Sequence, residues 1–513
     1  MKPATVVAAI CALGCVSPLF AQEQHSHPAP EKLGAVTFPT SCAPSVQKSF
    51  ERGVALLHSF AYTAAEEAFR AVAQADPGCA MAHWGMAMTY FHPLWAPPIA
   101  AELGKGAAAI AEAKRLTGRT PREQQFIEAA AAYYAGSAIS PTERAQAYEK
   151  AMAEAAQANP RDTEVQTFYA LALLATAPPA DRNHIQQKRA ADILEPLYRK
   201  LPQHPGLAHY LIHAYDSAEL ASRGLAASRA YSKIAPSAPH ALHMPSHIFT
   251  RMGYWDDSIA SNQAARAAAH AEGDVGEELH AMDYLTYAYL QRGSAEEAAR
   301  VIDELRGMSG IAGGEFKAGY AATAMPVRFA IEQRQWEKAA SLQPMPQLAP
   351  HVVAIVYWAR AIGQARSGHP QEAQSDVVKL NDCVRQLQAS GTAYWLNQTE
   401  VLSEAAQAWL LKAQGQSEDA VRRLRSAADK EDAVEKLPVT PGPVIPAREQ
   451  LGDLLLELKR PQEALREFQL ALQEAPGRRG ALTGAIQAAE LAGDAQTAAR
   501  LRADLTRVSR PTA

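Results

Sequence analysis

Apolar and small side chains recur along this chain three and four residues apart, which is the spacing of one face of an α-helix. The clearest stretch is 448–476, where two such runs are separated by a polar turn and followed by a proline. Its periodic positions are Leu451, Gly452, Leu455, Ala464, Phe468, Ala471 and Pro476. This stretch predicts two helices that pack against each other.

The same pattern returns elsewhere in the chain. Its other copies include Gly53, Ala65, Phe69 and Pro77 near the start, Ala227, Tyr231, Ile234 and Pro239 in the middle, and Gly493 and Ala498 near the end. Neither strand-like alternation nor a glycine-rich phosphate loop interrupts it. The sequence therefore predicts an all-α superhelix (solenoid) of roughly twelve helical hairpins, several degenerate, in which each hairpin buries its apolar face against its neighbours.

These positions resemble the tetratricopeptide repeat (TPR), a helix–turn–helix unit of about 34 residues. Over most of the mature chain, the overall pattern also resembles a widespread group of exported bacterial TPR proteins. The segments that carry this similarity are "DPGCAMAHWGMAMTYFHPLW", "HALHMPSHIFTRMGYWDDSI", "AIEQRQWEKAA" and "AADKEDAVEKLPVTPGPVIPARE". The resemblance implies a TPR-like fold and assigns no activity.

The first 21 residues combine Lys2, a short apolar run and small residues up to Ala21, which is typical of a cleaved export signal. Export predicts a periplasmic location, with lipid attachment at Cys15 as the alternative. Beyond the signal we expect four parts: a flexible leader (22–45), a TPR-like solenoid (46–430), a proline-rich connector (431–445) and a C-terminal repeat pair (446–513).

Charge and cysteine content narrow the picture further. A net charge of -4 without a basic run argues against a nucleic-acid partner, and the mature chain has no transmembrane segment by sequence. Removal of the signal leaves Cys42, Cys79 and Cys383. An oxidising compartment permits a Cys42–Cys79 disulfide, while three unpaired cysteines are the alternative.

Histidines gather on one side of three successive predicted helices. At 100° per residue, His240, His243, His247 and Arg251 share a narrow arc, opposite Leu242, Phe249 and Met252. The helix before it groups His209, His213 and Asp216, and the helix after it groups His280, Asp283, Tyr284 and Tyr287. Pro245 either kinks the middle helix or begins it, and in the second case His240 and His243 lie on the incoming loop.

The TPR resemblance implies that these side chains line one concave groove. The leading hypothesis is a binding protein for a peptide or small ligand, with contacts from His209, His213, His240, His243, His247, Arg251, His280, Asp283, Tyr284 and Tyr287. Because imidazole titrates near neutrality, such a groove should bind acidic ligands better at pH 6 than at pH 8.

The alternative hypothesis is a metalloprotein, conceivably a metal-dependent enzyme. The pairs His209/His213 and His243/His247 have the four-residue spacing that lets two imidazoles of one helix reach a single ion. Together with His280, they would suit zinc, copper or iron, and would bind metal more tightly at higher pH. No nucleophile motif requires an enzyme. A third hypothesis is a scaffold that recruits other envelope proteins through its outer surface.

Overall fold

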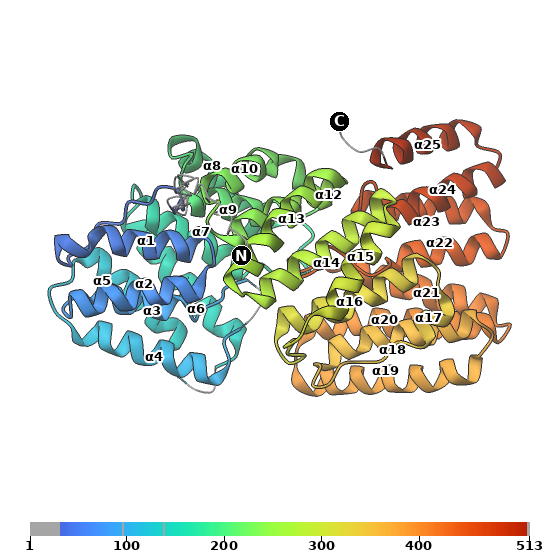
Figure 1. Cartoon of the computed structure of the whole chain (residues 1–513), viewed down its shortest axis with the longest axis horizontal. Coiled ribbons are helices and arrows are strands. Elements are labelled where there is room, and N and C mark those ends of the chain that lie inside the picture. Colours follow the sequence, from blue (N-terminus) through green and yellow to red (C-terminus); the bar gives the residue numbers. More distant parts are fainter. Residues whose placement is uncertain (1–30, 95–96, 137–138, 510–513) are drawn as a thin grey trace, which may run out of the picture. The chain divides into compact units, whose positions relative to one another are not determined.

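In the computed structural model, residues 31–94, 97–136 and 139–509 are described, and among them every regular element is helical. The predicted all-α, solenoid-like class is confirmed. Helices that are consecutive in the chain pack side by side as antiparallel pairs, for example α1 with α2 and α13 with α14 (Figure 1).

The first half contains a short 3-10 turn and twelve helices: η1 Pro44–Val46, α1 Gln47–His58, α2 Tyr62–Ala75, α3 Ala80–Met88, α4 Ala100–Arg115, α5 Pro121–Tyr134, α6 Pro141–Ala158, α7 Thr163–Ala175, α8 Ile185–Lys200, α9 Pro205–Ala214, α10 Ala221–Ile234, α11 Pro239–His243 and α12 Pro245–Met252. The second half runs through α13 Trp255–Glu272, α14 Val275–Arg292, α15 Ala295–Gly307, α16 Phe316–Glu332, α17 Trp336–Ala340, α18 Pro350–Arg366, α19 Pro370–Ser390, α20 Ala393–Ala413, α21 Ser417–Asp432, α22 Ala447–Glu457, α23 Pro461–Glu474, α24 Arg479–Leu491 and α25 Ala495–Ser509.

Local sequence signals explain where many helices begin and end. The start of α5 is a capping box in which the Thr120 side chain accepts from the Glu123 backbone N–H, while the Glu123 side chain accepts from the Thr120 backbone N–H. Gly253 and Gly293 end α12 and α14 with φ values of 68° and 91°, which a residue with a Cβ rarely adopts.

The repeated small and large positions pack as pairs. A Cβ built on Gly452 would lie 2.7 Å from the Phe468 ring, and one on Gly484 would lie 2.3 Å from the same ring. Near the start, Gly53 approaches Phe69 in the same way, at 2.7 Å. Glycine is therefore required where a phenylalanine of one helix lies against the backbone of its neighbours.

From Lys32 onwards the chain forms one compact unit with two apolar cores. One core is built from side chains between Leu33 and Ile248, and the other from side chains between Trp255 and Val508. The histidine-bearing helices α9 to α12 precede this change of core, and α14 follows it. The histidine-rich segment therefore lies where the two cores meet along the chain.

The prediction of a flexible leader over 22–45 is wrong from residue 32 onwards. Phe38 is fully buried, with its ring centroid 5.3 Å from that of Phe50 and 5.1 Å from that of Phe126. The Ala35 N–H donates to the Gln203 carbonyl at 2.9 Å. The apolar side chains of this segment complete the first core, which the polar composition of the leader did not indicate.

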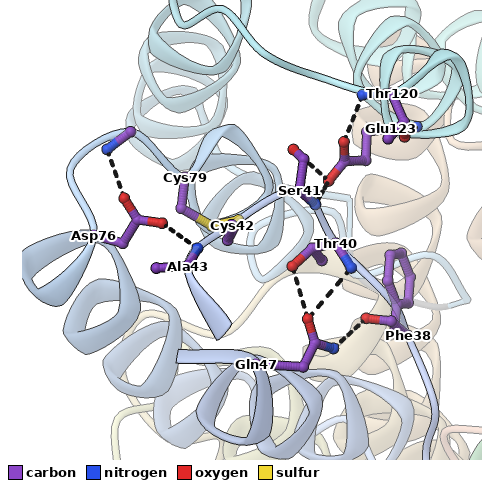
Figure 2. The surroundings of a disulfide bond; sticks show 11 residues. Phe38, Thr40, Ser41, Cys42, Ala43, Gln47, Asp76, Cys79, Thr120 and Glu123 are labelled. Carbon is purple, nitrogen blue, oxygen red and sulfur yellow. Dashed lines mark hydrogen bonds between the residues drawn. A yellow bond between two sulfur atoms is a disulfide. The ribbon is translucent and has the colours of Figure 1, made fainter. Parts of the chain in front are cut away.

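Cys42 and Cys79 form a disulfide that ties this segment to the start of α3 (Figure 2). Beside it, the Ala43 N–H donates to Asp76 Oδ2 at 2.7 Å, and the Ser41 N–H donates to Glu123 Oε1 at 2.7 Å. Cys383 is a buried free thiol, and burial raises its pKa to about 11.

The predicted connector is an irregular segment between α21 and α22, residues 433–446. It is partly buried: Val439, Thr440 and Val444 are each less than a tenth exposed. The predicted signal peptide and Cys15 lie outside the described residues. Within the described part of the chain, none of the helices combines the length and the apolar character that a bilayer crossing needs.

Candidate metal centre

Six histidines from the predicted stripe lie close together in the interior. They come from four helices: His209 and His213 from α9, His240 and His243 from α11, His247 from α12 and His280 from α14. Each is between 0% and 9% exposed. Their burial differs from the open groove expected from the sequence.

Two covers explain this burial. The ring of Phe60, just after α1, has its centroid 4.4 Å from that of His209. On the other side, Pro438 and Val439 of the connector line a small cavity together with His240 and His280. Neither cover is adjacent in sequence to the helices that it closes, so the helical wheel could not reveal it.

Pro245 begins α12, as in the second of the two alternatives for this residue. Met244 joins α11 directly to α12 with helical backbone angles. His240 and His243 thus lie on a five-residue helix rather than on a loop. They keep nearly helical spacing to His247, and all three rings point into the same interior.

His243, His247 and His280 form the first cluster, here called the α12 group. The Nε2 atoms of His243 and His247 lie 3.0 Å apart. The other ring nitrogens have acceptors: His243 Nδ1 lies 2.7 Å from Asn262 Oδ1, and His247 Nδ1 lies 2.9 Å from Asp216 Oδ2. Asn262 is oriented by its own Nδ2, which donates to the Ser258 carbonyl at 2.8 Å.

These contacts fix the tautomers of both rings. Because a carboxylate and an amide oxygen can only accept, the ring proton of His247 and that of His243 are on Nδ1. Both Nε2 atoms then carry lone pairs that face each other. Ligand atoms of His243, His247 and His280 all lie within 4.8 Å of one another.

His209, His213 and His240 form a second cluster, here called the α9 group. The Nε2 atoms of His209 and His213 also lie 3.0 Å apart. His209 Nδ1 donates to the His58 carbonyl at 2.6 Å. His240 completes the group, whose ligand atoms again lie within 4.8 Å of one another.

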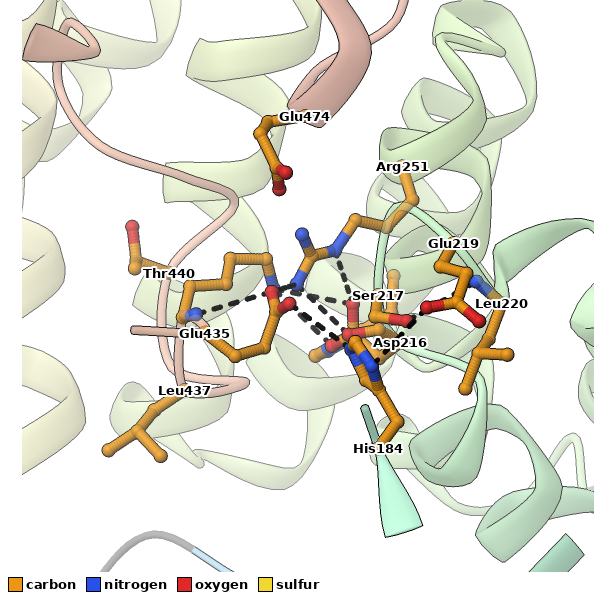
Figure 3. A network of polar contacts seen from close by, with 12 residues as sticks. His184, Asp216, Ser217, Glu219, Leu220, Arg251, Glu435, Leu437, Thr440 and Glu474 are labelled. Carbon is orange, nitrogen blue, oxygen red and sulfur yellow. Dashed lines mark hydrogen bonds and ion pairs between the residues drawn. The ribbon is translucent and has the colours of Figure 1, made fainter. Parts of the chain in front are cut away.

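Asp216 is the centre of a charged network beside the α12 group (Figure 3). It accepts from Arg251 Nε at 2.8 Å and lies 3.3 Å from Lys436 Nζ. Arg251 also donates to Glu435 of the connector at 2.7 Å. Although burial raises the pKa of Asp216, the charges of Lys436 and Arg251 hold it well below its usual range. Asp216 is therefore ionised and holds the connector as well as His247.

Five of the six histidines are neutral near neutral pH. Burial is the largest cause, and it holds the pKa well below the ordinary value in His209, His213, His243 and His280. Burial also lowers the pKa of His247, although its hydrogen bond to Asp216 opposes the shift. On the connector, burial and the charge of Arg251 lower the pKa of Lys436 to about 8.

Tyr284 lies against all three rings of the α12 group, with centroid distances of 4.7 Å to His243, 5.1 Å to His247 and 5.3 Å to His280. A void of about 10 Å³ is lined by His240, His247 and His280. Such a volume is close to the smallest that holds one water molecule.

Two of the residues predicted to join the histidines lie elsewhere. Asp283 faces Arg328 on α16, with 3.5 Å between its Oδ1 and the arginine Nε. Tyr287 lies under the guanidinium of Arg328, 5.0 Å from its ring centroid. Both expectations came from a wheel that placed them beside His280, but the packing of α16 against α14 draws them away. Arg251 reaches the histidines only through Asp216.

Several important residues were not among the predicted site residues. Asn262 and Asp216 orient ligand rings, and Lys436 lies beside the site from the connector. Glu277 lies 3.6 Å from His240 Nδ1 and pairs with Lys317. Asp216 shared the helical arc of His213, which was a usable signal. Asn262 and Lys436 had none, because they come from other helices or from irregular chain.

A third histidine cluster lies beside the α9 group, and we call it the carboxylate clamp. In it, Glu164 is held between His58 Nε2 and His204 Nε2, each at 2.9 Å. Burial raises the pKa of Glu164, but the two histidines reverse this and lower it to about 2. His58 Nδ1 lies 3.0 Å from the Tyr210 hydroxyl.

A cavity of about 590 Å³ reaches the edge of the histidines. Its lining includes His213, Asp216 and Lys436 together with apolar side chains such as Phe91 and Leu437. The cavity is large enough for a small molecule beside His213.

Comparison with known proteins adds little to this geometry. No family model and no curated protein matches the chain. Solved structures that are similar to it include a monomeric IFIT1 mutant with Gppp-AAAA (13% identity, TM-score 0.35), the human IFIT1 dimer with m7Gppp-AAAA (12%, 0.35) and another monomeric IFIT1 mutant with m7Gppp-AAAA (13%, 0.37). Each covers 84% of this chain and 90% of the other. Such low values support no inference about the ligand of this protein.

Proposed function

We propose that this protein is a metalloprotein in which His243, His247 and His280 bind a late first-row transition-metal ion. The observation that carries this proposal is the pair of facing Nε2 atoms, 3.0 Å apart, in rings whose protons are on the opposite nitrogens. Two lone pairs at this distance repel each other unless a proton or a metal cation lies between them, and burial disfavours the proton because it lowers the pKa of both rings.

The groups behind the two rings support the same conclusion. Metal-bound histidines almost always donate their second nitrogen to a carboxylate, a carbonyl or water, which fixes the ring and raises its basicity. Asp216 serves His247 in this way, and Asn262 serves His243. The neutral state of the buried imidazoles suits a metal ligand, and it offers little cationic charge to an acidic ligand at pH 6.

Three imidazoles leave at least one coordination position open, as in catalytic zinc sites. Zinc and copper suit an all-imidazole set best, and a bound ion would polarise water or a carbonyl. The cavity of about 590 Å³ would bring a small ligand to Asp216, the carboxylate behind His247. The proposal therefore includes a small-molecule ligand that binds at the metal ion or beside it.

Export to the periplasm is also part of the proposal. A disulfide between Cys42 and Cys79 supports it, because such bonds persist in oxidising compartments. The apolar start of the chain, read as a signal, is the second support.

Elemental analysis of protein purified without a histidine tag tests the proposal. After reconstitution with zinc or copper and removal of loose metal, we expect at least about one equivalent per chain. The double variant His243→Gln/His247→Gln should lose about one equivalent, while His204→Gln, a buried histidine of the carboxylate clamp, should lose none. Less than about a tenth of an equivalent in the reconstituted wild type would overturn the proposal.

A further inference from the structure

The α9 group repeats the construction of the α12 group. Each has two histidines four residues apart, with Nε2 atoms at 3.0 Å, and a third histidine from a neighbouring helix. Since successive hairpins present the same positions inward, the repeat itself places one three-histidine set beside another. A single ion bound by the α12 group leaves this second set unexplained.

The proton position in His209 is fixed as in the first group. The His58 carbonyl can only accept, so the proton of the His209 ring is on Nδ1, 2.6 Å from that oxygen. Its Nε2 therefore presents a lone pair to His213. Metal-bound histidines commonly donate their second ring nitrogen to a backbone carbonyl in this way.

An apolar wall closes the second group, as Tyr284 closes the first. The Phe60 ring has centroid distances of 4.4 Å to His209, 5.9 Å to His213 and 5.5 Å to His240. Tyr231 stacks on His209 at 5.1 Å. A dry shell of this kind strengthens metal–ligand electrostatics and limits solvent access to one side.

The positions of the ligand atoms, more than those of the rings, favour two ions over one shared ion, because these atoms gather in two separate sets of three. Within the groups, ring centroids lie 4.8 Å apart for His209 and His213, 4.3 Å for His243 and His280, and 6.5 Å for His247 and His280. Between the groups, the centroids of His213 and His247 lie 6.1 Å apart. Metal–nitrogen bonds of about 2.0–2.1 Å hold ligand nitrogens within about 4 Å of one another. The Nε2 pair of each group, at 3.0 Å, meets this limit, and the third histidine of each group has a ligand atom within 4.8 Å of the pair.

We infer that the protein holds a second transition-metal ion, bound by His209, His213 and His240, next to the ion of the α12 group. This inference rests on the proposed function. Two neighbouring ions, each with three imidazoles and an open position, form a site for a small bridging ligand such as hydroxide or a small oxyanion. The edge of His213 on the large cavity gives that ligand an entrance.

Zinc stoichiometry of the full, tag-free chain tests the inference. We compare wild type with His209→Gln/His213→Gln and with His243→Gln/His247→Gln, after equilibration with excess zinc and removal of unbound metal. Wild type should retain about two equivalents, and each double variant about one. Circular dichroism checks that each variant is folded, and the single variant His213→Gln replaces any double variant that is not.

The outcomes separate the two proposals. One equivalent in wild type that either double variant abolishes would mean a single shared ion and would overturn the inference while leaving the proposed function standing. Two equivalents that survive His209→Gln/His213→Gln would place the second ion elsewhere and also overturn it. No retained metal would contradict the proposed function itself. Copper loading gives an independent readout: the paramagnetic signal per bound Cu²⁺ should be weaker in wild type than in either variant, because neighbouring ions couple magnetically.

Discussion

The carboxylate clamp and the α12 group are both buried histidine clusters, yet they satisfy their ring nitrogens differently. In the clamp, an ionised Glu164 lies between the two imidazoles and accepts from each. In the α12 group, the acceptors lie behind the rings, and the facing Nε2 atoms of His243 and His247 contact each other, with a ligand atom of His280 within 4.8 Å. The first arrangement pairs its imidazoles with a carboxylate, whereas the second directs two ring nitrogens towards one point, where a cation would be bound.

This difference shows that the number and burial of histidines do not identify a metal site. What decides is where the acceptors lie. A carboxylate between two rings accepts a hydrogen bond from each of them. A carboxylate behind a ring accepts from its near nitrogen, which leaves the lone pair of the far nitrogen free to bind a metal ion. Among the described contacts, the clamp and the α9 group touch only at the backbone of His58, whose carbonyl orients His209 independently of the clamp side chains.

The largest difference in metal affinity between the two clusters should appear when the facing nitrogens of the α12 group are removed. In His243→Gln/His247→Gln, we expect affinity for the ion of the α12 group to fall by more than about 100-fold, because two of its ligands are lost. Competition with a chelator of known affinity measures this loss. An equal loss of metal affinity in His204→Gln would contradict the distinction between the clamp and the α12 group.

The clamp should matter for stability instead. Glu164→Gln removes the buried charge that both histidines share, and we expect the free energy of unfolding of the metal-free protein to fall by roughly 3–5 kcal/mol. Urea denaturation followed by circular dichroism gives the value. Metal content should stay unchanged, and a variant as stable as wild type would show that the clamp is not a stabilising unit.

An intermediate effect is expected for the acid behind the ring. Asp216→Asn weakens the acceptor of His247 Nδ1, so metal affinity should fall by about 10- to 100-fold without loss of the site. Glu435→Gln is the matched control, since Glu435 shares the Arg251 guanidinium with Asp216 but has no contact with His247 among those described. Similar effects in both variants would assign the change to the connector rather than to His247.

The smallest effect concerns acid stability. Two histidines lower the pKa of Glu164 from 4.5 to about 2 despite its burial, so its contribution is complete above pH 4.5 and is lost as the pH falls towards 2. At pH 4, wild type should have lost about 0.8 kcal/mol through this group, and Glu164→Gln should lack that loss. Urea titrations of both proteins at pH 6 and pH 4 measure the difference. An equal loss of unfolding free energy between pH 6 and pH 4 in both proteins would contradict this role of Glu164.

Sequence periodicity predicted the helices and the two His-x-x-x-His pairs, because both depend on local spacing of 3.6 residues per turn. The TPR resemblance implied that His280 faces the same groove as these pairs. Burial of the stripe could not be predicted, since Phe60 and the connector are far away in the chain. The orientation of each ring depends on Asn262, Asp216 and the His58 carbonyl, whose positions only packing determines.

Anomalous X-ray scattering from crystals of the tag-free, metal-loaded protein is the most direct test of a metal between the facing imidazoles. Data collected on either side of the absorption edge of the bound metal should give a peak within about 2.0–2.1 Å of both His243 Nε2 and His247 Nε2. A loaded crystal in which no anomalous peak contacts either atom would contradict the account.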